Sequence, residues 1–195
     1  MRLHIIRHGK AEQTSPDGTD FARPLRPRGV RQAIWLGQVL ADGVADGLKA
    51  GPPPTVILAS PVLRALNTAG IIARTLDLPV VIRPELSTSC DHRDVLGLLT
   101  RPPADMSGTA LSALRDGSVA IVGHNPTFED LIDQLRQPAH GHGHSGGAGP
   151  GRITLQTGMC VVLDFADARD GASAVHRHAG GLAGVVRLEE HHDGD

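Results

Sequence analysis

The stretch Leu3-His4-Ile5-Ile6-Arg7-His8-Gly9 decides how the rest of the sequence is interpreted. Its first four residues form a short apolar run, which is typical of a strand buried in a parallel sheet. Arg7 and His8 follow this run directly, at the point where such a strand would end. Ligands of open parallel α/β sheets bind beyond the carboxyl ends of the strands. The stretch therefore predicts a central strand and, at its end, a candidate pair of ligand-binding side chains.

Similar short apolar runs recur along the chain. They predict further buried strands at residues 56–59, 79–82, 119–122 and 160–163. Runs of this length with many β-branched residues favour parallel strands that are buried on both faces. Stretches with the apolar spacing of helices lie between them, and strands that alternate with helices predict an α/β layered fold with a mostly parallel sheet.

Three of the predicted helices carry start signals. Ser60-Pro61 and Asn125-Pro126 each place a capping side chain before a proline, and Asp91 can cap a third helix. The helices that begin at Pro61 and Pro126 would point their positive N-terminal ends at the same edge of the sheet as Arg7 and His8. This arrangement favours an anion site at that edge.

The chain has 195 residues, which is enough for one domain with a sizeable core. We expect a single domain over residues 1–188, with a loop insert rich in glycine and histidine at about residues 137–151. A polar tail follows at residues 189–195. The segment from Thr100 to Leu114 is a candidate lid.

Charge and composition exclude several classes of protein. The net charge of −2 lacks the basic excess of a nucleic-acid or anionic-membrane binder. The sequence has no apolar run of the roughly 20 residues that a membrane-spanning helix needs. The first apolar run is too short for a secretory signal, and two cysteines do not make a disulfide framework. We therefore expect a cytoplasmic protein without nucleic-acid or membrane partners.

Two arginines and two histidines are expected to meet at the carboxyl edge of the sheet. Arg7 and His8 follow the first strand, Arg64 lies in the helix after the second, and His124 follows the strand at 119–122. Taken alone, Arg64 has the alternative of a surface cation and His124 that of a cap or core residue. Together the four side chains favour a site for a dianion such as phosphate.

Each of these residue types has a chemical task at such a site. The guanidinium groups of Arg7 and Arg64 can hold phosphate oxygens through paired charged hydrogen bonds. His8 can attack phosphorus if one ring nitrogen is unprotonated and a backbone carbonyl holds the other as a donor. His124 can donate to the oxygens as charge builds in the transition state. Gly9 allows close backbone approach beside the nucleophile, and Lys10 either adds to the positive field or is solvated.

These motifs resemble the signatures of the histidine phosphatase superfamily. The resemblance is carried by Arg7-His8-Gly9, by Ser60-Pro61 leading to Arg64, and by Gly123-His124-Asn125-Pro126. Two further pieces, Arg23-Pro24-Leu25 followed by Gly29 and Thr157-Gly158-Met159, resemble the SixA-type phosphohistidine phosphatases. The likeness extends from Met1 to about Phe165, outside the inserts.

The resemblance implies a phosphoglycerate mutase-like fold, which is a single-domain three-layer sandwich with a mostly parallel central sheet flanked by helices. It implies that His8 becomes transiently phosphorylated, and that Arg7, Arg64, His124 and Gly9 bind the substrate phosphate. It implies no metal and no organic cofactor.

A general acid is harder to find. Many ester phosphatases of this superfamily use a carboxyl group to protonate the leaving oxygen. Glu85 is the candidate here, with a surface carboxylate as its alternative, and Asp91 and Asp94 are weaker candidates. An imidazole leaves more easily than an alkoxide, because the pKa of its conjugate acid is only about 6.5. A site that is poor in acids therefore favours a phosphorus–nitrogen bond.

The sequence thus predicts a metal-independent phosphatase that hydrolyses phosphohistidine in a protein or peptide, through a covalent intermediate on His8. A small-molecule phosphomonoesterase on the same scaffold is one alternative, and a non-catalytic phosphate-binding module is another. The expected partner is a phosphorylated protein or a small phosphorylated substrate. The oligomeric state is left open.

Overall fold

The computed structural model describes residues 1–45, 48–49, 51–106, 108–136, 151–165 and 181–186. Its centre is a six-stranded sheet with the order β5-β4-β6-β1-β7-β8. The strands are β1 (Arg2–Arg7), β4 (Val56–Ala59), β5 (Val80–Ile82), β6 (Ser118–Gly123), β7 (Cys160–Asp164) and β8 (Gly181–Val186). β5, β4, β6 and β1 run parallel to one another, so the predicted mostly parallel sheet is confirmed.

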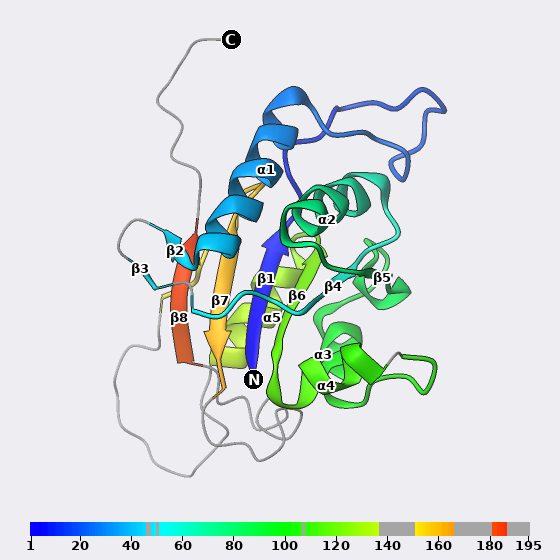
Figure 1. The fold of residues 1–195 in the computed structure, drawn as a ribbon. Helices are drawn as coiled ribbons and strands as arrows, with labels where there is room; N and C mark the ends of the chain where they lie inside the picture. Colours follow the sequence, from blue (N-terminus) through cyan, green and yellow to red (C-terminus); the bar gives the residue numbers. More distant parts are fainter. Residues whose placement is uncertain (46–47, 50, 107, 137–150, 166–180, 187–195) are drawn as a thin grey trace.

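Helices cover both faces of the sheet (Figure 1). α1 (Pro27–Asp42) and α2 (Leu63–Leu76) pack side by side on one face. α3 (His92–Thr100), α4 (Gly108–Asp116) and α5 (Thr127–Arg136) lie on the other. A short hairpin of β2 (Val44–Ala45) and β3 (Leu48–Lys49) follows α1, and a 3-10 turn, η1 (Pro84–Leu86), follows β5. The predicted three-layer α/β sandwich is confirmed.

The core divides into two halves because successive strand residues face opposite sides of the sheet. Leu3 and Ile5 of β1 pack in a cluster with Phe128 of α5. Ile6 faces the other way, into a cluster with Leu36 of α1 and Ala69 of α2. The sheet is therefore buried on both faces, as continuous apolar strands require.

One strand runs in a direction that the sequence does not predict. The apolar run at residues 160–163 predicts a buried parallel strand, and β7 forms there, but it pairs antiparallel with β1. A continuous apolar run indicates a strand that is buried on both faces. β7 is such a strand, since it is buried and lies between β1 and β8. The run carries no information about strand direction.

Two helices begin later than predicted. α2 begins at Leu63 and α5 at Thr127, so neither proline is the first helical residue. Ser60 does not cap α2, because the residue before the first helical turn is Val62 and no described side chain caps the helix; the Ser60 hydroxyl instead lies 2.9 Å from a ring nitrogen of His124. The predicted cap at Asp91 is confirmed, since its carboxylate accepts the backbone N–H groups of Arg93 and Asp94.

The candidate lid is part of the folded layer. Its carboxyl-terminal half forms α4, whose residues Ala110, Ala113 and Leu114 are buried in the core. The loop insert predicted at 137–151 falls outside the described residues except for Gly151, and so does the tail at 189–195.

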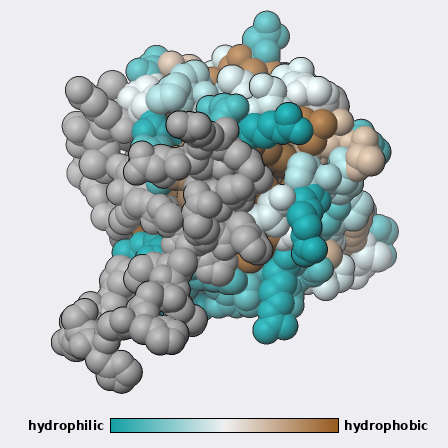
Figure 2. All heavy atoms as spheres, turned by 90° about the horizontal axis from the view of Figure 1, so that it is seen from below, coloured by the Kyte–Doolittle hydropathy of each residue, from teal (hydrophilic) through white to brown (hydrophobic). Residues whose placement is uncertain are grey.

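The end of the molecule where β1 begins carries mostly polar and neutral side chains in its described part, with apolar atoms in smaller groups (Figure 2). Among the described helices, none combines the length and the apolar character that spanning a membrane requires.

Two glycines allow the chain after β1 to lie against the start of α1. A Cβ atom built on Gly9 would lie 2.5 Å from the carbonyl oxygen of Gly29. A Cβ atom on Gly29 would in turn overlap the carbonyl oxygen of Lys10. Real Cβ atoms do not approach backbone this closely, so the contact requires glycine on both sides. This packing fixes the backbone that carries His8.

Gly29→Ala is expected to lower the free energy of unfolding by about 1–3 kcal/mol, because the added methyl group must displace backbone. Thermal unfolding of the variant measures the effect. Gly97→Ala in α3 is the matched control, since open space surrounds its Cβ position and alanine is favoured over glycine inside a helix. Equal melting temperatures for the two variants would contradict the packing argument.

Candidate active site

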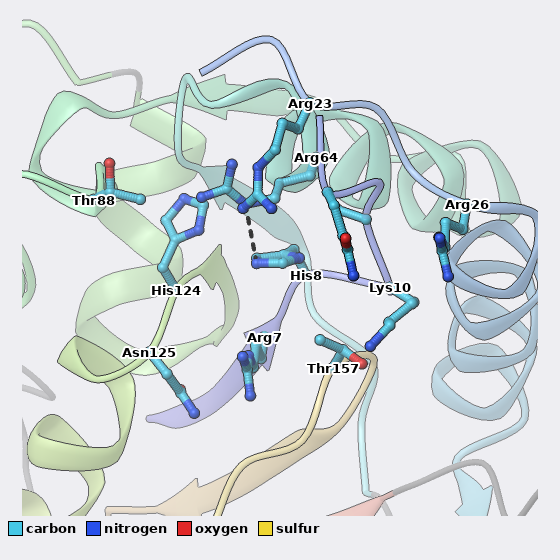
Figure 3. Close-up of a pocket in the computed structure, with 12 residues that line it drawn as sticks. Arg7, His8, Lys10, Arg23, Arg26, Arg64, Thr88, His124, Asn125 and Thr157 are labelled. Carbon is cyan, nitrogen blue, oxygen red and sulfur yellow. Dashed lines mark hydrogen bonds between the residues drawn. The ribbon is translucent and has the colours of Figure 1, made fainter. Parts of the chain in front are cut away.

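The carboxyl ends of β1, β4 and β6 meet at one edge of the sheet, beside a cavity of about 330 Å³ (Figure 3). The cavity is lined by residues from the ends of β1 and β6, from α2, from the loop before α1, from the segment after η1 and from the turn before β7. In Figure 3, His8 lies between His124 on one side and Lys10 on the other. The structure thus brings Arg7, His8, Arg64 and His124 together from distant parts of the sequence, as the strand ends predict.

The His8 ring is held in one tautomer. Its Nδ1 lies 2.7 Å from the carbonyl oxygen of Gly9. A carbonyl only accepts, so Nδ1 carries the proton and Nε2 keeps a lone pair. The Nε–H of Arg64 donates to Nε2 over 3.2 Å, which agrees with this assignment. His8 therefore presents an unprotonated nitrogen to the cavity, as a nucleophile must.

Arg64 is anchored on two sides. Besides its bond to His8, it donates through Nη1 to the backbone carbonyl of Asp20 at 2.8 Å and through Nη2 to the Asp20 carboxylate at 3.0 Å. The Arg64 side chain is only 5% exposed, whereas that of Asp20 is 60% exposed. Asp20 therefore holds the guanidinium from the solvent side and leaves the cavity side open. The sequence analysis did not identify this role, because Asp20 stands 44 residues before Arg64.

A serine hydroxyl orients the His124 ring. Ser60 is fully buried, and its Oγ accepts the backbone N–H of Val62 at 3.2 Å. Its own hydrogen also needs an acceptor, and Nε2 of His124 lies 2.9 Å away. We infer that Ser60 donates to Nε2, which leaves the single ring proton on Nδ1. That Nδ1 is buried and has no partner among the described residues, so it is free to donate to a ligand.

Ser60→Ala is expected to lower kcat/KM by about tenfold, because His124 loses the contact that keeps the proton on Nδ1, and loss of a direct oxyanion donor costs about 100-fold or more. The loss should appear mainly in kcat, since the hydrogen bond from the His124 Nδ1–H to the substrate oxygen strengthens as charge develops in the transition state. Steady-state kinetics with a thermal melt to confirm folding measures both. An unchanged kcat with a raised KM would contradict the assigned tautomer.

Arg7 is fixed by a carbonyl at the far wall of the cavity. Its Nη1 donates to the Leu155 oxygen at 2.8 Å, and the Nδ2 of Asn125 donates to the same oxygen and to a carboxylate oxygen of Glu129. Leu155 N–H donates to the same Glu129 oxygen. The Nε of Arg7 is buried and has no partner among the described residues. This network fixes the Arg7 side chain while leaving a donor unused.

The charged side chains that line the described cavity are all basic. Five basic residues line it, and none of the described lining residues is acidic: Arg7, Lys10, Arg23, Arg26 and Arg64 supply the charge. Burial, with a further contribution from Arg64, lowers the pKa of His8 to about 4 despite the Gly9 carbonyl. Burial and the neighbouring His8 and Arg64 lower the pKa of His124 to about 3. Both imidazoles are therefore neutral near pH 7, and an anion is the ligand that this field favours.

The candidate acids lie elsewhere. Glu85 does not line the cavity; it pairs with Arg83 at 2.7 Å. The hydrogen bond from Arg83 lowers the pKa of Glu85, which does not suit a proton donor. Asp91 and Asp94 cap α3 through their side chains. Thr88 is the residue of this segment that lines the cavity.

Gly9 supports the site from behind rather than from the cavity wall. Its N–H donates to the hydroxyl of Thr68 at 3.0 Å, so this N–H is already used. It does not line the cavity. On the other side of the same turn, the N–H of Gly158 lies 3.1 Å from the carbonyl oxygens of both Arg7 and His8. The backbone that carries the two site residues is thus held from two directions.

A model of the histidine phosphatase superfamily (branch 1) matches residues 3–90. This part of the chain is therefore similar to the histidine phosphatase superfamily, as the motifs predict. The matched part includes Arg7, His8 and Arg64 and ends before His124, which the fold adds to the same cavity. The predicted superfamily and the predicted class of enzyme, a phosphatase, are confirmed at this level. A search of curated protein sequences finds no match.

Solved structures with the same fold include three described as SixA. A putative phosphohistidine phosphatase SixA from Nakamurella multipartitia is 24% identical, with a TM-score of 0.71 and 95% of each chain covered. The protein histidine phosphatase SixA complexed with tungstate is 20% identical, with a TM-score of 0.65, covering 96% of this chain and 97% of that one. A putative SixA from Agrobacterium tumefaciens is 22% identical, with a TM-score of 0.63 and the same coverage. At these identities the likeness establishes the fold alone.

Proposed function

We propose that this protein hydrolyses phosphohistidine in a protein or peptide, through a phosphoryl group carried transiently on His8. The proposal rests on a nucleophilic histidine in a cavity whose described lining offers no carboxyl group to act as a general acid. His8 presents an unprotonated Nε2 to the cavity, and the described lining residues include no carboxyl group. The fold shared with structures described as SixA supports the same substrate class.

In the first step the Nε2 lone pair of His8 attacks phosphorus, and a P–Nε2 bond forms as the bond to the substrate nitrogen breaks. The electron pair stays on the substrate ring. When the other nitrogen of that ring carries a proton, the group leaves as neutral imidazole and needs no acid from the enzyme. Arg7, Arg64 and the Nδ1–H of His124 stabilise the charge on the three phosphoryl oxygens.

In the second step water attacks the phosphorus of phosphorylated His8. The P–Nε2 bond breaks, its electron pair returns to Nε2, and the proton of the water passes to the phosphate. The Gly9 carbonyl keeps the proton on Nδ1 throughout, so His8 also leaves as neutral imidazole. Among the described residues there is no group of three or more side chains that could hold a metal ion, and no step above uses one.

A substrate series that differs only in the leaving group tests the proposal. We expect kcat/KM to fall from a phosphohistidine peptide to a generic aryl phosphate and then to a phosphoserine peptide, because an alkoxide is the most basic leaving group and lacks a proton donor here. Equal rates on phosphoserine and phosphohistidine would contradict the proposal and favour a small-molecule or ester phosphatase. Phosphate binding without turnover of any substrate would favour a non-catalytic binding module.

A further inference from the structure

The four groups assigned to the phosphoryl group account for only part of the positive charge at the cavity. Lys10, Arg23 and Arg26 also line it. In Figure 3 Arg23 lies beside Arg64, whereas Lys10 and Arg26 lie on the side of His8 away from His124. Two acidic residues pair with these arginines: Asp20 lies 2.8 Å from Arg23, and Glu12 lies 2.9 Å from Arg26. Neither acid lines the cavity. The cavity side of the loop therefore presents cations.

Two of these cations, Lys10 and Arg26, lie on a hydrogen-bonded piece of backbone. The N–H of Arg26 donates to the Lys10 carbonyl at 2.9 Å, and the N–H of Glu12 donates to the Pro24 carbonyl at 2.9 Å. Ala11 and Leu25 form an antiparallel bridge between the two bonds. Residues 10–12 and 24–26 are thus a two-stranded ribbon. The backbone of Lys10 and Arg26 is therefore fixed relative to His8, which precedes the ribbon by two residues.

Arg23 has a donor that nothing in the described structure uses. Its Nη1 donates to the Glu12 carbonyl at 3.1 Å, and Nη2 pairs with Asp20. Its Nε is buried and has no partner among the described residues. Arg23 and Arg64 pair with the two oxygens of the same Asp20 carboxylate. The unused donor of Arg23 therefore belongs to the phosphoryl end of the cavity, and Lys10 and Arg26 are the cations that remain.

We propose that Lys10 and Arg26 form a second anion subsite, the rim subsite, which binds the carboxylate of an acidic residue next to the phosphorylated side chain. The substrate would then be a phosphopeptide segment with an acidic residue beside the phosphorylated one. That the substrate is a peptide rests on the proposed function. The overall charge of −2 argues against a polyanion such as nucleic acid as the occupant.

Matched phosphonates test the rim subsite without any turnover. Isothermal titration calorimetry would compare alkylphosphonates with ω-carboxyalkylphosphonates of the same two- to four-carbon length. At one length or more we expect the carboxylate to tighten binding by about fivefold, as for a favourable exposed ion pair. In the double variant Lys10→Gln, Arg26→Gln the gain in affinity from the carboxylate should fall below about twofold. The plain alkylphosphonate should still bind.

The control is Arg115→Gln, because Arg115 is an exposed cation at the end of α4 and does not line the cavity. It removes charge without touching the rim subsite, so the carboxylate gain should persist. Absence of a gain at every length in the unchanged protein would overturn the inference. The inference would also be overturned if the carboxylate tightened binding to the double variant as much as it does to Arg115→Gln.

Peptide kinetics separate this inference from the proposed function. Phosphohistidine peptides that carry Asp or Asn beside the phosphorylated residue should differ in KM in the unchanged protein and not in the double variant. If neither peptide is hydrolysed but the phosphonate gain is present, the proposed function fails and the rim subsite stands. If both peptides are hydrolysed with the same KM and the phosphonates show no gain, the rim subsite fails alone.

Discussion

His8→Ala is expected to lower turnover of every substrate by about a thousandfold or more, because no other described group in the cavity can form the covalent intermediate. Quenching the unchanged protein during turnover with denaturant at alkaline pH should trap a phosphoryl group whose stability is that of phosphohistidine: labile in acid and stable in base. The variant should show no such label. Mass spectrometry of the trapped protein would assign the label to His8.

His92→Ala is the matched control for this experiment. His92 is the first residue of α3 and does not line the cavity, so its loss should leave both the label and the rate unchanged. Turnover or labelling retained in His8→Ala would remove the nucleophile assignment. Loss of labelling at His8 with full turnover would show that water attacks the substrate directly.

Arg64→Lys is expected to lower kcat/KM by about 100-fold or more, although it keeps the charge. An ammonium cannot reproduce the three contacts that Arg64 makes, namely Nε to His8 and two bonds to Asp20. The loss should appear in both kcat and phosphate affinity, measured by kinetics and by inhibition with inorganic phosphate.

Arg74→Lys provides the comparison within the same helix, because Arg74 lies exposed in the last turn of α2. It should leave the rate unchanged. If Arg64→Lys kept full activity, positive charge alone would be enough at this position. The guanidinium geometry would then have no role in the mechanism.

The site residues that the sequence reveals are those that directly follow apolar runs. Arg7, His8 and His124 stand at strand ends, and parallel strands bring their carboxyl ends to one edge, so convergence could be inferred without coordinates. The fold class followed from the same runs. Strand direction did not, because the residues of β7 encode burial rather than orientation.

The supporting residues were missed for a different reason. Ser60 was interpreted as a helix cap from its local motif, and its contact with His124 spans 64 residues. Asp20 carries no motif of its own, and its role depends on where the loop before α1 folds back. Glu85 and Thr88 are three residues apart, and only the path of η1 and the following turn decides which of them lines the cavity. Tertiary contacts of this kind leave no local pattern.

The concentration of positive charge around neutral imidazoles has a consequence for the stability of the whole molecule. In the absence of ligand, Arg7 and Arg64 repel one another across a cavity whose described lining has no acid. Burial and the nearby Arg64 lower the pKa of Arg7, although the charge of Glu129 opposes this shift. An oxyanion that binds there cancels this repulsion and joins the ends of β1, β4 and β6. Anion concentration and resistance to heat are therefore thermodynamically linked, so phosphate in the medium should raise the melting temperature as it inhibits.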